Sequence, residues 1–127
     1  MKEGDEIRRY IIEFGLGMDF HGQDVGRAAE KAVNDAVSKS CLCGLKEVLG
    51  IEDIENEVFV NVTIAVSDPD KIQEEKIKQC LPIGKKSIKA VKGGLKIPGL
   101  YMPQFGDVDD SIEVAVACVE VGLPEKK

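Results

Sequence analysis

A stripe of small apolar side chains within residues 24–42 constrains the fold more than any other feature of the sequence. The stripe repeats at intervals of three and four residues, which places it on one face of a helix: Val25, Ala28, Ala29, Ala32, Val33, Ala36 and Val37. Asp24 comes just before the stripe, and its carboxylate is a good N-cap. Because alanine and valine project little from a helix, the pattern predicts a helix over 24–42 that packs closely on a sheet.

Four segments have the patterns of strands in such a sheet. Residues 57–67 alternate most cleanly, and residues 7–14 alternate as well. Residues 111–121 are almost entirely apolar, which is typical of a central strand or an interface strand. Residues 85–96 are rich in lysine, which is typical of an exposed sheet edge. Between the last two strands lies a long loop, GGLKIPGLYMPQFGDVDD, and loops of this length tend to be functional or mobile.

A second helix is predicted from Ser67 or Asp68 to about Leu81, with Pro69 at its first position. The element order is therefore β-α-β-α-β-β. We expect a single α+β domain over residues 1–127, with a four-stranded mixed sheet and two helices on one face. Strands 57–67 and 111–121 carry apolar side chains on both faces, so the uncovered face should meet another copy of the chain.

Composition argues against several classes of partner. The net charge of −6 disfavours nucleic acid, because binding phosphates requires a basic face. No apolar run approaches the length of a membrane span, and the N-terminal residues lack the apolar core of a signal peptide. The four cysteines are then most simply reduced thiols. We therefore expect a cytoplasmic protein with no membrane partner.

Residues 13–24, EFGLGMDFHGQD, form the strongest candidate site. A glycine-spaced turn between a strand and a helix start is a recurring ligand-binding arrangement, since the helix start offers free N–H groups. We expect Gly15, Gly17 and Gly22 to let a ligand approach the backbone, with Asp24 at the helix start. The third glycine of a dinucleotide-binding fingerprint is missing, so that interpretation is rejected.

Asp19 and His21 are the candidate catalytic and metal-binding residues of this turn. In extended backbone a D-x-H pair lies on one face, so the carboxylate and the imidazole can share a divalent ion such as zinc, manganese or magnesium. His21 is the only histidine, so a third ligand must be an acid or a cysteine; the candidates are Glu13, Asp24, Asp109, Asp110 or a residue of a neighbouring subunit. Two alternatives remain open: an acid/base pair without metal, and a turn held by Asp19 or Asp24 for structural reasons.

The lysine-rich strand gives a second candidate site. Lys92, Gly93 and Gly94 at its end combine positive charge with exposed amides, which suits a phosphate or carboxylate. The alternative is a solvated edge strand.

The run Gly15–Gly22 follows the pattern G-x-G-x-D-x-H-G. This motif, the LPIG at residues 81–84 and the GG at 93–94 resemble a Lin-type family of uncharacterised conserved hypothetical proteins, found in bacteria and, with an N-terminal extension, in plants. The resemblance covers nearly the whole chain and implies no established activity.

The same stretch is distantly similar to the first strand of methylerythritol cyclodiphosphate synthase, whose motif Asp and His bind a divalent metal. That resemblance would place a metal on Asp19 and His21, but the family's third ligand is a later histidine that this chain lacks. These enzymes, the Bacillus-type chorismate mutases and the YjgF-like proteins are trimers with sites between subunits, which implies a chorismate-mutase-like or YjgF-like trimer here.

Together these features predict a homo-oligomer, a trimer by analogy with those families, that binds an anionic small molecule at or near a subunit interface. Its reaction would be lyase-like or hydrolase-like. The alternative is a non-catalytic ligand-binding or regulatory module in which Asp19 and His21 are structural.

Overall fold

The computed structural model describes residues 6–21 and 23–125, and Gly22 therefore lies outside the described residues. The strands are β1 (Ile7–Asp19), β2 (Phe59–Val66), β3 (Lys85–Lys92), β4 (Leu95–Pro98) and β5 (Ser111–Pro124). The helices are α1 (Val25–Val37), α2 (Gly44–Glu47), α3 (Ile54–Glu57) and α4 (Glu74–Lys78), with 3-10 turns at Pro69–Lys71 and Pro103–Phe105.

The strands form one mixed sheet in the order β1-β5-β2-β3, and β4 pairs with the first residues of β5. Only the β2–β3 pair is parallel. The predicted α+β class is confirmed, and so are the central position of residues 111–121 and the edge position of the lysine-rich strand. The prediction of four strands is wrong, because the sheet has five. Glycines 93 and 94 turn the chain after Lys92, so the predicted strand 85–96 becomes β3 and part of β4.

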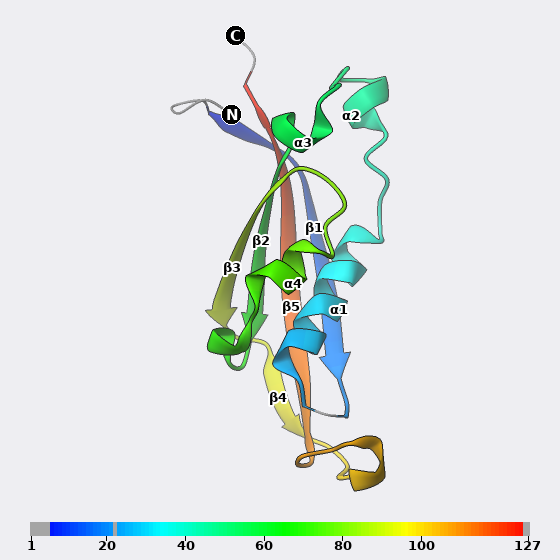
Figure 1. Cartoon of the computed structure of the whole chain (residues 1–127), viewed down its shortest axis with the longest axis vertical. Helices are drawn as coiled ribbons and strands as arrows, with labels where there is room; N and C mark the ends of the chain where they lie inside the picture. Colours follow the sequence, from blue (N-terminus) through cyan, green and yellow to red (C-terminus); the bar gives the residue numbers. More distant parts are fainter. Residues whose placement is uncertain (1–5, 22, 126–127) are drawn as a thin grey trace.

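The helices lie on one face of the sheet, with α1 across β1 and β5 and α4 beside β3 (Figure 1). Asp24 is the N-cap of α1, as predicted, and its side chain accepts a hydrogen bond from the N–H of Arg27. The helix ends at Val37, five residues before the predicted end. The second predicted helix is shorter as well, consisting of the turn at Pro69–Lys71 and the single-turn helix α4.

Glycines in β1 allow α1 to lie unusually close to the sheet. An added Cβ at Gly15 would lie 2.0 Å from the carbonyl oxygen of Ala32, and one at Gly17 would lie 2.2 Å from that of Ala28. Any larger side chain would therefore push the helix away. The glycine face of β1 is thus buried against the alanine stripe of α1, so the space predicted for a ligand at Gly15 and Gly17 is occupied by the helix.

The opposite face of the sheet is open and apolar. On β1 it carries Ile12, Phe14, Leu16 and Met18, each between 37% and 57% exposed. The strand register places further apolar residues beside these side chains on the same face. They are Val114, Val116 and Cys118 of β5, Ala65 of β2, Val91 of β3 and Leu95 of β4. Tyr10 departs from the predicted alternation because the register shifts between Arg9 and Ile11.

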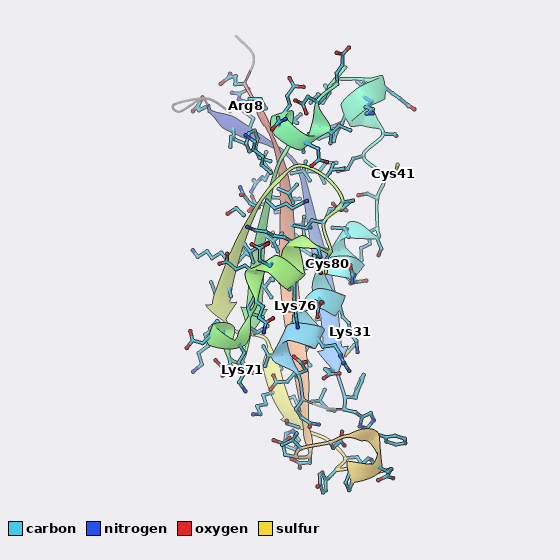
Figure 2. The ribbon with its side chains drawn as sticks, in the orientation of Figure 1. Arg8, Lys31, Cys41, Lys71, Lys76 and Cys80 are labelled. Atoms are coloured by element: carbon cyan, nitrogen blue, oxygen red, sulfur yellow. The ribbon has the colours of Figure 1, made fainter. Side chains whose placement is uncertain are left out.

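The outer edge of β1 is covered by side chains from α1 and from the turn that follows it. Lys39 donates to the carbonyl of Phe14, Asp35 accepts from the N–H of Leu16, and Lys31 donates to the carbonyl of Met18, all at 2.9 Å. Figure 2 shows Lys31 on α1 beside this strand. Lys31 and Asp35 are four residues apart on one face of α1, and Lys39 comes two residues after the end of the helix. Their hydrogen bonds use backbone N–H and carbonyl groups of β1 that would otherwise be free to pair with another strand.

We predict that Gly17→Ala lowers the free energy of unfolding by about 3 kcal/mol, because the methyl group overlaps backbone atoms that cannot rotate away. Gly26→Ala is the matched control. There the new Cβ meets only the carboxylate of Asp24, at 3.2 Å, and helix propensity favours alanine by up to about 1 kcal/mol. Urea denaturation measures both; equal midpoints for the two variants would contradict the close contact.

We predict a pH-dependent contribution from Asp35. Its pKa is lowered from 3.8, first by the hydrogen bond from the N–H of Leu16 and then by Lys39. The carboxylate therefore stabilises the fold above pH 3.8, and the contribution disappears as the pH falls through the lower, folded-state pKa. Asp35→Asn should thus lower the urea midpoint at pH 7, with a difference that shrinks below pH 3.8. Asp70→Asn, at an exposed turn residue, is the control; a pH-independent difference for Asp35→Asn would refute the prediction.

Candidate functional site: a histidine–aspartate pair

His21 lies in the turn between β1 and α1, and its partner comes from the long loop before β5. Its Nδ1 is 2.9 Å from Oδ1 and 3.1 Å from Oδ2 of Asp107. The Asp107 side chain is fully buried, whereas that of His21 is 41% exposed. The ring of Phe105 packs against the imidazole with 5.0 Å between centroids. We refer to His21 and Asp107 as the histidine–aspartate pair.

The pair determines which nitrogen of His21 is available. An ionised carboxylate only accepts hydrogen bonds, so with Asp107 ionised this contact requires the proton on Nδ1. In the neutral ring Nε2 then keeps its lone pair. Such a nitrogen can accept a proton, donate one once protonated, or bind a metal ion. The arrangement is the one that orients a catalytic histidine in many acid–base sites.

Gln23 holds the turn and the loop together. Its carbonyl oxygen accepts from the N–H of Val108 at 2.8 Å, and its amide donates to the carbonyl of Ser111 at 3.0 Å and to Asp107 at 3.4 Å. Its backbone has φ +50°, a left-handed conformation that costs a non-glycine residue of order 1 kcal/mol. The side-chain hydrogen bonds offset this cost. Gln23 therefore fixes the position of the loop relative to the turn that contains His21.

The loop carboxylates are also held in place. The N–H of Met102 donates to Oδ2 of Asp107 at 2.7 Å, which orients the carboxylate toward His21. Asp109 accepts from both the hydroxyl and the N–H of Ser111, and these hydrogen bonds lower the pKa of its carboxyl. These hydrogen bonds fix the end of the predicted long loop around Asp107.

Asp19 has different partners from His21. Its Oδ2 accepts from the N–H of Asp24 at 2.9 Å, and its Oδ1 lies 3.8 Å from Nζ of Lys31. Both Asp19 and its cross-strand neighbour Glu113 are 3% exposed. Glu113 accepts from Ser67 at 2.6 Å and lies 3.9 Å from Lys96. Asp19 thus joins the end of β1 to the start of α1, and Asp107 takes the position beside His21 that we had expected for Asp19 or Asp24.

The other predicted site residues are dispersed. Lys92 is exposed at the end of β3, the sheet edge opposite β1. Gly94 has φ +64°, and an added Cβ would lie 2.2 Å from the carbonyl oxygen of Val114, so this glycine serves the β3–β4 turn. Gly93 lies against Ala65, where an added Cβ would be 2.9 Å from the alanine Cβ.

The candidate third metal ligands do not gather around His21. Glu13 is six residues before Asp19 in β1, about 20 Å away along an extended strand. Asp24 caps α1, and Asp109 is bound to Ser111. Within residues 6–21 and 23–125, no group of three histidine, cysteine, aspartate or glutamate side chains is arranged to hold a metal ion. Metal binding stays a prediction that a single subunit, as described, does not assemble.

Comparison with known proteins places the chain in a family. A family model described as a conserved hypothetical protein (Lin0512_fam) matches residues 9–121. The chain belongs to the Lin0512 family of conserved hypothetical proteins. The predicted membership of a Lin-type family is therefore confirmed, and the match spans β1 to β5 without assigning an activity. A comparison with curated proteins returns no match.

One solved structure resembles this Lin0512 family member throughout. It is the crystal structure of an FtsZ-like protein of unknown function from Nostoc punctiforme, with a TM-score of 0.87 and 35% identity over 96% of this chain and 100% of that chain. An FtsZ dimer from M. jannaschii is also matched, with a TM-score of 0.30 and 12% identity over 85% of this chain and 26% of that one. That score is too low to support an argument.

No helix in the described part of the chain is long and apolar enough to cross a membrane. All four cysteines are free thiols.

Sequence reasoning singled out His21, but it missed Asp107 and Gln23 as its neighbours. Asp107 lies 86 residues from His21 and in a segment without periodicity. The one available signal was the acidic end of the glycine- and proline-rich loop, which drew attention to Asp109 and Asp110 instead.

We predict that NMR will show His21 as the Nδ1–H tautomer when neutral. His21 is the only histidine, so its ring nitrogens are assigned without ambiguity. Asp107→Asn removes the acceptor charge and should give a mixture of tautomers with faster exchange of the ring proton. Asp110→Asn in the same loop is the control. An Nε2–H tautomer in the unmodified protein would contradict the geometry.

Proposed function

We propose that this protein is a homo-oligomeric enzyme that acts on a small anionic metabolite, with His21 as its proton-transferring residue. The observation that supports this most directly is the 2.9 Å contact between Nδ1 of His21 and the buried carboxylate of Asp107. It presents Nε2 on a half-exposed ring whose orientation is held by a second residue. Structural histidines are usually satisfied at both nitrogens, and no hydrogen bond to Nε2 occurs among the described residues.

The chemistry would be proton transfer. Nε2 would accept a proton from a carbon acid or from an attacking water, and Asp107 would stabilise the imidazolium that forms. Returning that proton to a leaving group would complete a lyase-like or hydrolase-like reaction. Gln23 and Phe105 would act as positioning residues, since they hold the loop and the ring but do not offer a titratable group.

Self-association is the second part of the proposal. The open sheet face exposes several large apolar side chains near one end, including Leu16 and Met18. Contiguous exposed apolar surface of this kind usually marks an interface. The β1 edge is covered by Lys31, Asp35 and Lys39, so association by strand pairing at that edge is disfavoured and association through the face is favoured.

An interface on this face would also bear on the site. Phe20 and Phe105 flank His21 and are 50% and 60% exposed, so a second subunit could cover His21 as well as the sheet. A trimer of the chorismate-mutase or YjgF type would achieve this. Lys92, at the opposite sheet edge, could then reach the site of a neighbouring copy and bind the anionic group of the metabolite. The protein would be cytoplasmic in this proposal.

We favour proton transfer over metal binding because Asp19, the predicted co-ligand, is already engaged by Asp24 and Lys31. A divalent ion on His21 would need ligands from another subunit. Elemental analysis of protein purified without chelator, beside His21→Ala, distinguishes the two possibilities. One ion per subunit that is lost in the variant would favour the metal.

The test combines ligand binding with oligomeric state. We expect pools of small carboxylates and phosphates to raise the thermal midpoint of the unmodified protein by several degrees, as ligand binding to the folded state requires. His21→Asn should abolish that shift while leaving the unliganded midpoint within about 2 °C. If His21 is only structural, the variant should instead melt earlier, and no pool should shift either protein.

Leu16→Glu should dissociate the oligomer, measured by light scattering, and should abolish ligand binding together with it. Val48→Glu is the control, because Val48 is 78% exposed but lies outside the sheet face. Ligand binding by a monomeric Leu16→Glu variant would show that the site does not need a second subunit.

A further inference from the structure

A cavity lies at the other end of α1 from His21. Its volume is about 420 Å³, within the range of small-molecule sites. Because α1 has 13 residues, the two ends of the helix are about 20 Å apart. The cavity is therefore separate from the histidine–aspartate pair.

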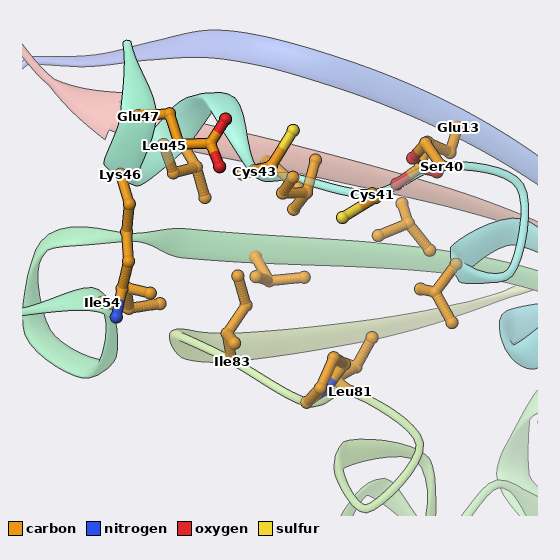
Figure 3. Close-up of a pocket in the computed structure, with 16 residues that line it drawn as sticks. Glu13, Ser40, Cys41, Cys43, Leu45, Lys46, Glu47, Ile54, Leu81 and Ile83 are labelled. Atoms are coloured by element: carbon orange, nitrogen blue, oxygen red, sulfur yellow. Dashed lines mark hydrogen bonds between the residues drawn. The ribbon is translucent and has the colours of Figure 1, made fainter. Parts of the chain in front are cut away.

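The walls of this cavity are apolar. Val60, Val119 and Val121 of the sheet contribute to it, together with Leu42 and Ile83 from two loops. Figure 3 shows the segment from Ser40 to Glu47 on one side and the segment around Leu81 and Ile83 on the other. The three valines are at most 3% exposed, so the inner wall belongs to the hydrophobic core. Such a cavity favours a hydrocarbon body.

Charged side chains line the cavity at its two ends. Figure 3 places Glu13 and Ser40 at one end and Lys46 and Glu47 at the other. The hydroxyl of Ser40 donates to Oε2 of Glu13, and the Glu13 side chain is partly buried. No cation lies within ion-pair distance of Glu13 among the described residues. Glu13 is therefore a partly exposed carboxylate at the rim of an apolar cavity, where a cation could pair with it.

This arrangement defines the chemistry of an occupant. An ammonium group would give Glu13 its missing cation through a charge-assisted hydrogen bond, and the attached hydrocarbon would fill the apolar walls. A carboxylate head group would be repelled by Glu13, and an alcohol would donate a hydrogen bond to the carboxylate without adding the positive charge that an ammonium group supplies. The cavity therefore distinguishes three otherwise similar amphiphiles by their head groups.

We propose that the cavity between the 40–47 segment and the 81–83 loop binds a small apolar amine, with its ammonium group on Glu13. This site is independent of the function proposed for His21. Neither the family match nor the similar solved structure assigns it.

Two thiols report on occupancy. Cys41 and Cys43 line the cavity and are exposed. Cys80 and Cys118 lie outside it, and burial raises the pKa of both of these thiols, so they should react slowly with iodoacetamide. An amine in the cavity should slow alkylation of Cys41 and Cys43 without changing that of Cys80 and Cys118.

The experiment is calorimetric titration with hexylamine, 1-hexanol and hexanoate, which share one chain and differ in head group. We expect hexylamine to bind about fivefold more tightly than hexanol, because only the ammonium group adds an ion pair with the partly exposed carboxylate. Glu13→Gln should remove that preference. Mass spectrometry of the alkylated cysteines locates the bound amine.

Two further variants complete the design. Leu42→Trp should fill the cavity and abolish binding of all three probes, and Ile12→Trp, next to Glu13 but on the opposite sheet face, should leave binding unchanged. If Leu42→Trp fails to fold by circular dichroism, Glu13→Gln still decides the head-group assignment. The proposal is overturned if no probe binds, if hexanoate binds more tightly than hexylamine, or if Glu13→Gln keeps the amine preference.

Discussion

The close contact between β1 and α1 is the constraint on which the rest of this structure depends. Gly15 and Gly17 have no side chain, and the helix presents alanines, so the backbones approach until an added Cβ would overlap carbonyl oxygens. This distance brings Lys31, Asp35 and Lys39 within reach of the strand edge. It also directs the large apolar side chains of β1 to the other face. The contact between β1 and α1 therefore leads both to the covered outer edge of β1 and to the uncovered face of the sheet.

The same contact places the candidate site. Because α1 packs on β1 and runs back along it, the chain must reverse direction between the end of β1 and the start of α1. His21 lies in this reversal. That turn meets the loop before β5 because β5 pairs with the full length of β1. Asp107, Gln23 and Phe105 then surround the imidazole, although no local pattern connects them. The cavity with Glu13 at its rim arises at the opposite end, where α1 stops at Val37 and the chain continues to α2.

Sequence patterns predicted the local elements well and the side-chain partners poorly. The alanine stripe, the Asp24 cap and the alternation in residues 57–67 are short-range signals, and each corresponds to the expected element. The two faces of β1 differ from what side-chain hydrophobicity alone suggests. Phe14 and Leu16 are normally core residues, but the glycine side is buried because it alone permits the approach of the helix. The fifth strand was missed because β4 has only four residues, one of them a proline.

What the sequence by itself determined is the α+β class, the helix that packs closely on a sheet, the edge position of the lysine strand and the turn that contains the single histidine. These follow from periodicity and from the steric properties of glycine, alanine and proline, which act over a few residues. The tertiary structure alone decided that Asp107 accompanies His21, that Asp19 is buried with Lys31 beside it, and that Glu13 lines an apolar cavity. Those pairings join residues distant in the chain, and only strand register and helix placement bring them together.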